Sequence, residues 1–198
     1  HDQPRAVSRF GDPGSYWRES ATALATAYFL QRGTPFIYQG QEIGMLGGSL
    51  LKRCDFRDVE SLNFLAGLEG DEVPVGLAAM SRDNGRTPMQ WDDSLTAGFT
   101  SSEPWIDVPP SAAVINVAAQ IQDPGSILSY YKALIDARHR VPALTEGSLE
   151  RIDVGSPALF VYRRRTAGSE VLVMVNLSGS VQTPHFPAPD EAWAPSHW

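Results

Sequence analysis

The chain opens with the stretch HDQPRAVSRFG, residues 1–11, and the rest of the sequence is interpreted outward from it. Taken alone, the pair His1-Asp2 carries little information, because most such pairs lie in loops or cap a helix. A polypeptide that begins with His rather than Met, on so polar a dipeptide, is expected to be a piece of a longer one. The meaning of the pair therefore depends on the segments that follow.

The next forty residues predict one strand-and-helix unit. Proline and glycine residues interrupt positions 1–14, which are expected to form a loop. Apolar residues then recur at helical spacing from Ser15 to Arg32, and Gly33 is placed where a helix commonly ends. Thr34 to Gln39 is expected to form a short buried strand. A loop, a helix, a short apolar strand and a glycine-rich exit are typical of the last unit of a TIM barrel.

Longer motifs follow at defined spacing: GTPFIYQGQEIGM at 33–45, SRDNGRTPMQW at 81–91, AGFT at 97–100 and EPW at 103–105. With HDQPR they make the chain, from His1 to about Asn176, closely resemble the C-terminal third of bacterial oligo-1,6-glucosidases and α-glucosidases. Those enzymes belong to the α-amylase family, glycoside hydrolase family thirteen. The resemblance implies an α/β fold, the C-terminal portion of a TIM (β/α)8 barrel followed by a partial antiparallel β-sandwich.

The remaining pattern agrees with that order of elements. A helix is predicted from Asp55 to Leu68, with Val59, Leu62 and Leu65 on one face, and residues 70–110 are expected to be mostly loop. Asp123-Pro124 is a favourable helix start, with Asp as N-cap and Pro at the first position, and Val141-Pro142 should end that helix. By resemblance this is the eighth barrel helix.

After Pro142 the pattern becomes that of strands. The runs at 148–154, 159–165 and 171–176 predict an antiparallel meander, similar to the small C-terminal β-domain of the same enzymes. The predicted domains are therefore 1–142, the end of the barrel, and 143–198, the partial β-domain. The Pro-rich last twenty residues no longer follow the family pattern and are expected to be a domain cut short or a disordered tail.

Composition excludes several classes of partner. The formal net charge of −7 argues against nucleic acid, and the only basic run, Arg163-Arg164-Arg165, is expected to end a strand at the surface. No apolar run is long enough to span a bilayer. With one cysteine, Cys54, an internal disulfide is impossible, which suits a cytoplasmic location. Neither a cofactor nor a metal is expected, because His139, His185 and His197 are isolated. The oligomeric state stays open.

The resemblance assigns roles to four residues. Asp2 corresponds to the family's third carboxylate, which contacts the hydroxyls of the sugar being cleaved and stabilises the positive charge that develops in the transition state. His1 is expected to donate to the same hydroxyls. Arg82 and Arg86 are expected to bind the substrate, since a guanidinium offers a planar set of donors. A surface arginine without function is the plain alternative for both.

Other residues in the same motifs are expected to support the site rather than to take part in its chemistry: Arg5, Arg9, Gln39, Glu42 and Asp83. The aromatic side chains Trp91, Phe99 and Trp105 could stack on sugars or pack in the core, and the sequence favours neither.

The resulting hypothesis is a fragment of a retaining, exo-acting α-glucosidase that acts on a small oligosaccharide. The nucleophile and the acid/base would lie upstream of His1, so the isolated chain is expected to be inactive. Within the family, a dextran glucosidase, a trehalose-6-phosphate hydrolase and a sucrose isomerase remain alternatives. Outside enzymes, a non-catalytic scaffold ectodomain would not need His1-Asp2, and a carbohydrate-binding module should carry its aromatics on the β-domain.

Overall fold

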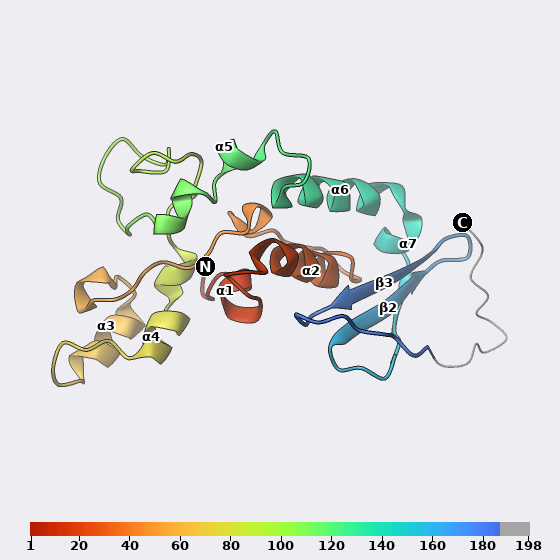
Figure 1. Ribbon diagram of the computed structural model, residues 1–198, viewed down its shortest axis with the longest axis horizontal. Helices are drawn as coiled ribbons and strands as arrows, with labels where there is room; N and C mark the ends of the chain where they lie inside the picture. Colours follow the sequence, from red (N-terminus) through yellow and green to blue (C-terminus); the bar gives the residue numbers. More distant parts are fainter. Residues whose placement is uncertain (187–198) are drawn as a thin grey trace. The chain divides into compact units, whose positions relative to one another are not determined.

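The computed structural model describes residues 1–186, so the prediction for the Pro-rich tail falls largely outside the described residues, as does His197. In chain order the α-helices are α1 (Ala6–Phe10), α2 (Trp17–Phe29), α3 (Val59–Ala66), α4 (Val75–Met80), α5 (Val117–Gln120), α6 (Ile127–Arg140) and α7 (Pro142–Thr145). The strands are β1 (Ser148–Arg151), β2 (Leu159–Arg165) and β3 (Glu170–Asn176), and short 3₁₀ helices are η1 (Gln41–Ile43), η2 (Arg53–Asp55), η3 (Arg82–Gly85) and η4 (Pro110–Ala113). Figure 1 follows these elements along the chain.

The chain divides into two compact units. The first contains His1–Leu24 and Phe36–Ala133, and the second contains Ala25–Pro35 together with the chain from Leu134 onward. Every residue with a predicted role in the site belongs to the first unit. The predicted domain boundary after residue 142 stays a prediction.

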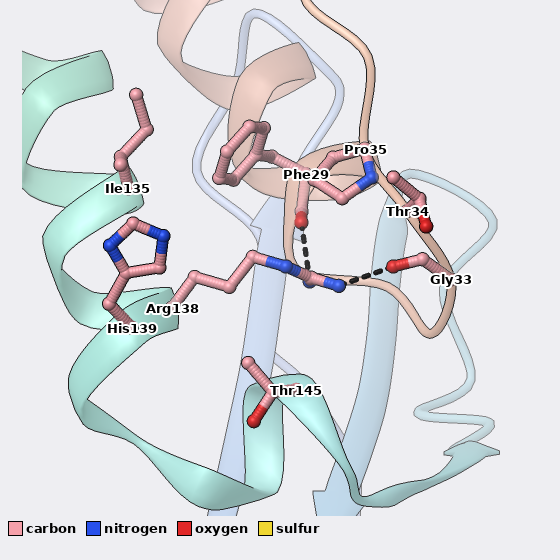
Figure 2. A pocket seen from close by; sticks show the side chains of 8 residues that line it. All are labelled: Phe29, Gly33, Thr34, Pro35, Ile135, Arg138, His139 and Thr145. Atoms are coloured by element: carbon pink, nitrogen blue, oxygen red, sulfur yellow. Dashed lines mark hydrogen bonds between the residues drawn. The ribbon is translucent and has the colours of Figure 1, made fainter.

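The predicted helix at 15–32 forms, but it is shorter at both ends, since α2 runs from Trp17 to Phe29. Gly33 lies beyond that end, with a φ of 119° in the region that favours glycine. The carbonyl oxygens at this end accept hydrogen bonds from two arginines, rather than from the main-chain N–H groups of a glycine cap. Arg138 donates to the carbonyls of Phe29 and Gly33, drawn in Figure 2, and Arg164 donates to that of Leu30 at 2.7 Å.

The buried strand predicted at Thr34–Gln39 is wrong. The segment forms no strand, and Phe36 is 83% exposed. Apolar residues in a short run indicate a buried strand only if neighbouring strands exist to cover them. Among residues 1–186 the only sheet is the C-terminal meander, so this segment has no strand beside it.

Part of the predicted loop at 70–110 is helical, since it contains α4 and η3. The predicted helix at 55–68 starts later, at Val59, because Asp58 rather than Asp55 is its N-cap. Leu65 is buried, but Val59 and Leu62 on the predicted inner face are exposed. Leu65 packs with Phe56 from the preceding loop and with Leu77 of α4, and this small core fixes α3 and α4.

Helix α6 starts at Ile127, three residues after the predicted first position at Pro124, because Ser126 is the cap. The Ser126 hydroxyl accepts from the N–H of Ser129 at 3.1 Å. Asp123 closes the preceding turn instead, accepting from the N–H of Gly125. The predicted end before Val141-Pro142 is confirmed, since α6 ends at Arg140.

The antiparallel meander is confirmed, with strand order β1-β2-β3. Leu159 and Val161 on one face of β2 pack with Val154, whereas the Tyr162 hydroxyl on the other face donates to main-chain carbonyls of α2. The prediction that the three arginines end this strand at the surface is wrong for Arg164, which has no exposed surface. Its guanidinium reaches the carbonyls of Leu30, Gly147 and Ser148, so hydrogen bonds replace the water it loses.

Candidate active site

The Asp2 carboxylate lies beside two arginines. Arg82 is the first residue of η3, and Arg86 directly follows η3. Asp2 Oδ1 is 3.0 Å from Arg86 Nη2 and 3.8 Å from Arg82 Nη1. The side chain of Asp2 is nevertheless 57% exposed, while those of Arg82 and Arg86 are 30% and 22% exposed. One carboxylate oxygen is therefore fixed by guanidinium groups, and the side chain still has an open face that a ligand could reach.

His1 contacts the other oxygen of the same carboxylate. Its Nε2 is 3.5 Å from Asp2 Oδ2, and its main-chain carbonyl accepts from Arg86 Nε at 3.1 Å. All four residues with a predicted role, His1, Asp2, Arg82 and Arg86, are thus brought together although the two pairs are eighty residues apart. Their chemical roles stay predictions.

Local structure explains why the arginines face Asp2. The Ser81 hydroxyl caps η3 by accepting from the N–H of Asp83, and the Asn84 amide donates to the carbonyls of Ala78 and Ser81. The Tyr38 hydroxyl donates to the Gly85 carbonyl at 2.7 Å. These hydrogen bonds fix both ends of η3.

Gly85 brings η3 close to the first residues of the chain. A Cβ built at this position would lie 2.6 Å from the carbonyl oxygen of Gln3. The two segments are therefore in van der Waals contact at the point where Asp2 meets Arg86, and Figure 1 shows the N-terminus beside this part of the chain.

Sequence reasoning missed the carboxylate that joins the two arginines. Asp58 Oδ1 is 2.7 Å from Arg82 Nη2 and 3.3 Å from Arg86 Nη1, and the Asp58 side chain is only 2% exposed. Glu60, which is exposed, adds a longer contact of 3.7 Å to Arg82. The signal available was the sequence Asp58-Val-Glu-Ser61, in which Asp precedes an apolar run as an N-cap does.

The electrostatics of this contact favour two ionised partners. Hydrogen bonding to Asp58 raises the pKa of the Arg82 guanidinium above its ordinary value. Burial pushes the pKa of the Asp58 carboxyl upward, but hydrogen bonds from Ser61 and Arg82 outweigh burial and leave it below the ordinary value. The pair is therefore charged at neutral pH.

Arg5 and Asp83, predicted to be supporting residues, are both buried. Arg5 donates to the carbonyl of Gln39 and to Thr87, and it stacks over the Tyr38 ring at 5.2 Å. Burial lowers the pKa of the Arg5 guanidinium. Asp83 accepts from the main-chain N–H groups of Arg57 and Asp58. Both side chains join loops around the site without contacting Asp2.

The other predicted supporting residues are less clearly placed. Arg9 donates to the side chain of Gln3, and the Gln39 carbonyl receives Arg5. Glu42 has one buried carboxylate oxygen without a hydrogen-bond partner among the described residues.

The three aromatic side chains of the loops are not core residues of the described chain. Trp91 and Phe99 are each 51% exposed, and Trp105 is 64% exposed. Between the first two, Ala97 is fully buried at a φ of 53°, and its carbonyl accepts from the N–H of Trp91 and of Asp92. Their exposure leaves sugar stacking open as a prediction.

A mainly apolar pocket of about 310 Å³ lies elsewhere, in the second unit. Figure 2 shows its lining by Phe29, Pro35 and Ile135, with Arg138 and His139 at its side. None of the residues with a predicted role lines it, so it is not the candidate site.

Within residues 1–186 no three His, Cys, Asp or Glu side chains converge as a metal site would require. The helices of the same residues are all too short or too polar to span a bilayer.

Comparison with known families identifies the chain. Residues 1–147 match the model of the α-amylase catalytic domain. The chain belongs to the α-amylase family. The carboxylate and the two arginines described above all lie within the matched residues. The predicted α/β barrel class agrees with this family, although the chain contains only part of such a domain.

Relatives with known names are similar over nearly the whole chain. An oligo-1,6-glucosidase of Parageobacillus thermoglucosidasius is 44% identical over 196 residues, which cover 96% of this chain and 34% of that protein. A trehalose-6-phosphate hydrolase of Escherichia coli is 46% identical over 92% of this chain and 34% of its own length. The chain thus spans about a third of the length of the curated relatives it matches.

Solved structures are similar to the same extent. A mutant isomaltulose synthase of Erwinia rhapontici, in complex with its natural substrate sucrose, superposes with a TM-score of 0.85 at 43% identity. The match covers 92% of this chain and 34% of that one. The trehalulose synthase MutB of Pseudomonas mesoacidophila gives a TM-score of 0.82 at 41% identity, over 95% of this chain and 39% of its own.

Proposed function

We propose that the chain is part of a retaining, exo-acting α-glucosidase that hydrolyses α-1,6 and/or α-1,4 glucosidic bonds of short oligosaccharides. The observation that carries the proposal is the Asp2 carboxylate, which is exposed but fixed by Arg86 at 3.0 Å and approached by Arg82 and His1. Family membership and the oligo-1,6-glucosidase among the relatives support it.

The proposed chemistry divides between this chain and residues outside it. Retaining hydrolysis requires a nucleophile and an acid/base whose carboxyl groups lie about 5–5.5 Å apart. We propose that both come from the part of the protein that precedes His1. Asp2 would stabilise the oxocarbenium-like transition state, because a fixed anion gains interaction energy as positive charge develops on the sugar ring.

The neighbours of Asp2 would hold the sugar. His1 would donate to hydroxyls of the glucosyl unit, and Arg82 and Arg86 would bind further hydroxyls with guanidinium edges that Asp2 and Asp58 leave free. Residues 143–198 would belong to a partial β-sandwich domain, and the protein would act in the cytoplasm.

A second candidate is hydrolysis of trehalose 6-phosphate, favoured by the 46% identity to the Escherichia coli enzyme of that name. The isomaltulose synthase among the similar structures makes sucrose isomerisation a third possibility within the same chemistry. All three reactions begin by cleaving a glucosidic bond, so Asp2 would have the same role in each.

The test compares the full-length polypeptide with the 198-residue chain on isomaltose, maltose, trehalose 6-phosphate and sucrose. We expect the full-length protein to release glucose from isomaltose or maltose and the 198-residue chain to release none. Turnover by the short chain would overturn the proposed division of the catalytic residues. If the full-length protein turns over none of the four sugars, the proposed glucosidase function is wrong and a non-catalytic scaffold is favoured.

A further inference from the structure

Asp58 has two separate sets of partners, one for each carboxylate oxygen. Oδ2 accepts from the N–H and from the hydroxyl of Ser61, each at 3.1 Å, and so caps helix α3. Oδ1 receives Arg82 at 2.7 Å and Arg86 at 3.3 Å. A helix cap would be satisfied by the first set alone, so the second set calls for a further explanation.

The arginines on Asp58 are the same two that reach Asp2. Arg86 spans the two carboxylates, with Nη1 on Asp58 and Nη2 on Asp2. Arg82 does the same through its two terminal nitrogens, at 2.7 Å from Asp58 and 3.8 Å from Asp2. The buried carboxylate and the exposed one are therefore joined through two shared guanidinium groups.

The buried end of this connection is itself fixed. Asp83 is fully buried, and its Oδ2 accepts from the main-chain N–H of Asp58 at 3.0 Å and from that of Arg57 at 2.7 Å. The Ser61 hydroxyl also contacts that of Ser81, the cap of η3, at 2.9 Å. The residue that holds the arginines and the turn that carries them thus share hydrogen bonds.

Charge explains why a carboxylate is needed between the arginines. Two guanidinium groups that approach one exposed carboxylate repel each other, and solvent competes for the exposed contacts. A buried anion that touches both offsets the repulsion where water is excluded. It also reduces the number of rotamers open to each long side chain before substrate arrives.

We propose that Asp58 is a positioning residue that holds Arg82 and Arg86 and, through them, orients the Asp2 carboxylate for glucosidic bond cleavage. The catalytic part of this inference rests on the proposed function. The role of Asp58 as a helix cap is the alternative to be separated from it.

Asp58→Asn separates the two roles in the full-length protein. Asparagine keeps the size and an acceptor for the Ser61 N–H, and it is as good an N-cap as aspartate, but it has no charge for the arginines. We expect kcat/KM to fall about 10- to 100-fold, mainly through kcat. The unfolding free energy should fall by a smaller factor, because the capping acceptor is kept and only the charge that pairs with the arginines is lost. Wild-type kcat/KM in a folded variant would overturn the proposal.

The matched control is Asp123→Asn. Asp123 also accepts a turn N–H, from Gly125, and also lies beside an arginine, with Oδ2 3.6 Å from Arg18, but it contacts none of the residues at the site. We expect its kcat/KM to stay within about twofold of wild type.

A double-mutant comparison tests the route of the effect. In a protein that carries Arg82→Gln and Arg86→Gln, adding Asp58→Asn should lower kcat/KM by no more than about twofold, because the residues through which Asp58 acts are already gone. Effects that multiply in full would show that Asp58 acts by another route and would overturn the proposal.

Crystal structures of the full-length wild type and of the Asp58→Asn variant provide a readout that does not depend on turnover. We expect the contact between Arg86 and Asp2 to be lost in the variant and kept in the Asp123→Asn control. An unchanged contact would contradict positioning by Asp58 even in a protein that cleaves no glucoside. Absence of turnover in the wild type would instead contradict the proposed function.

Discussion

The chain contains two pairs of arginines that bind different kinds of partner, and one pair lies in each compact unit. Arg82 and Arg86 are partly exposed and bind carboxylates, whereas Arg138 and Arg164 are buried and bind main-chain carbonyls at the end of α2. The first pair keeps donor edges near an exposed anion. The second satisfies carbonyl groups that a helix end leaves without partners. The comparison separates arginines expected to matter for activity from arginines expected to matter for stability.

The largest effect is expected where the first pair meets its exposed anion. Asp2→Asn in the full-length protein should lower kcat/KM about a thousandfold or more, which corresponds to about 4 kcal/mol of transition-state stabilisation. Urea unfolding should change little, because the side chain is exposed.

The control for this change is Glu150→Gln. Glu150 is an exposed carboxylate that binds Arg163 at 2.6 Å in the second unit, and its loss should leave kcat/KM unchanged. If Asp2→Asn stays within tenfold of wild type, the assignment of Asp2 is wrong.

The next largest effect belongs to the buried pair. Arg164→Met should destabilise the full-length protein by about 3 kcal/mol, because the carbonyls of Leu30, Gly147 and Ser148 lose their donor inside the protein. Urea unfolding measures the loss, and kcat per folded molecule should stay at the wild-type value. A variant as stable as wild type would show that water reaches these carbonyls.

Arg86→Lys sharpens the contrast at a smaller scale. An ammonium group can replace the charge but not the two nitrogens that reach Asp58 and Asp2 together, so kcat/KM should fall about tenfold. Stability should change by less than about 1 kcal/mol, since the exposed half of the contact contributes little. An equal loss of activity and stability would place Arg86 with the buried pair.

The smallest expected effect is a pH dependence. The pKa of Asp58 in the folded protein lies below its ordinary value of about 3.9, so its stabilising contribution is complete above about pH 4 and is lost as pH falls through the lowered folded-state pKa. The difference in unfolding free energy between wild type and Asp58→Asn should therefore shrink from pH 6 to pH 3. A difference that grows on acidification would contradict an ionised, paired Asp58.

Sequence periodicity predicted what depends on neighbours along the chain. The helix at α2 and the meander formed as expected, because helical spacing and short β-rich runs between turns are local patterns. The start of α6 was predicted too early, because Asp123 closes the preceding turn, whereas the Ser126 hydroxyl accepts from the first turn of the helix.

Long-range contacts account for the larger errors. Thr34–Gln39 is apolar enough for a strand, but a strand exists only where another pairs with it. Because side chains alternate along β2, Arg164 lies on the same face as Tyr162. This alternation was overlooked because three consecutive arginines suggested an exposed strand end. At the site, the motif around Arg82 gave the residues but not the buried carboxylate, since Asp58 lies two dozen positions upstream.

Hydrogen exchange in the segment after α2, which pairs with no strand of the described residues, can report whether this chain associates with the rest of a barrel. Main-chain amides without partners exchange their hydrogens with solvent in the time that an unstructured peptide needs, whereas amides in a sheet are protected. If the remaining two-thirds of the relatives' length is supplied as a second polypeptide, deuterium uptake at Thr34, Phe36 and Ile37 measures directly whether the two polypeptides associate. The segment that lacks a strand partner within residues 1–186 is thus the place where association with a second polypeptide is easiest to detect.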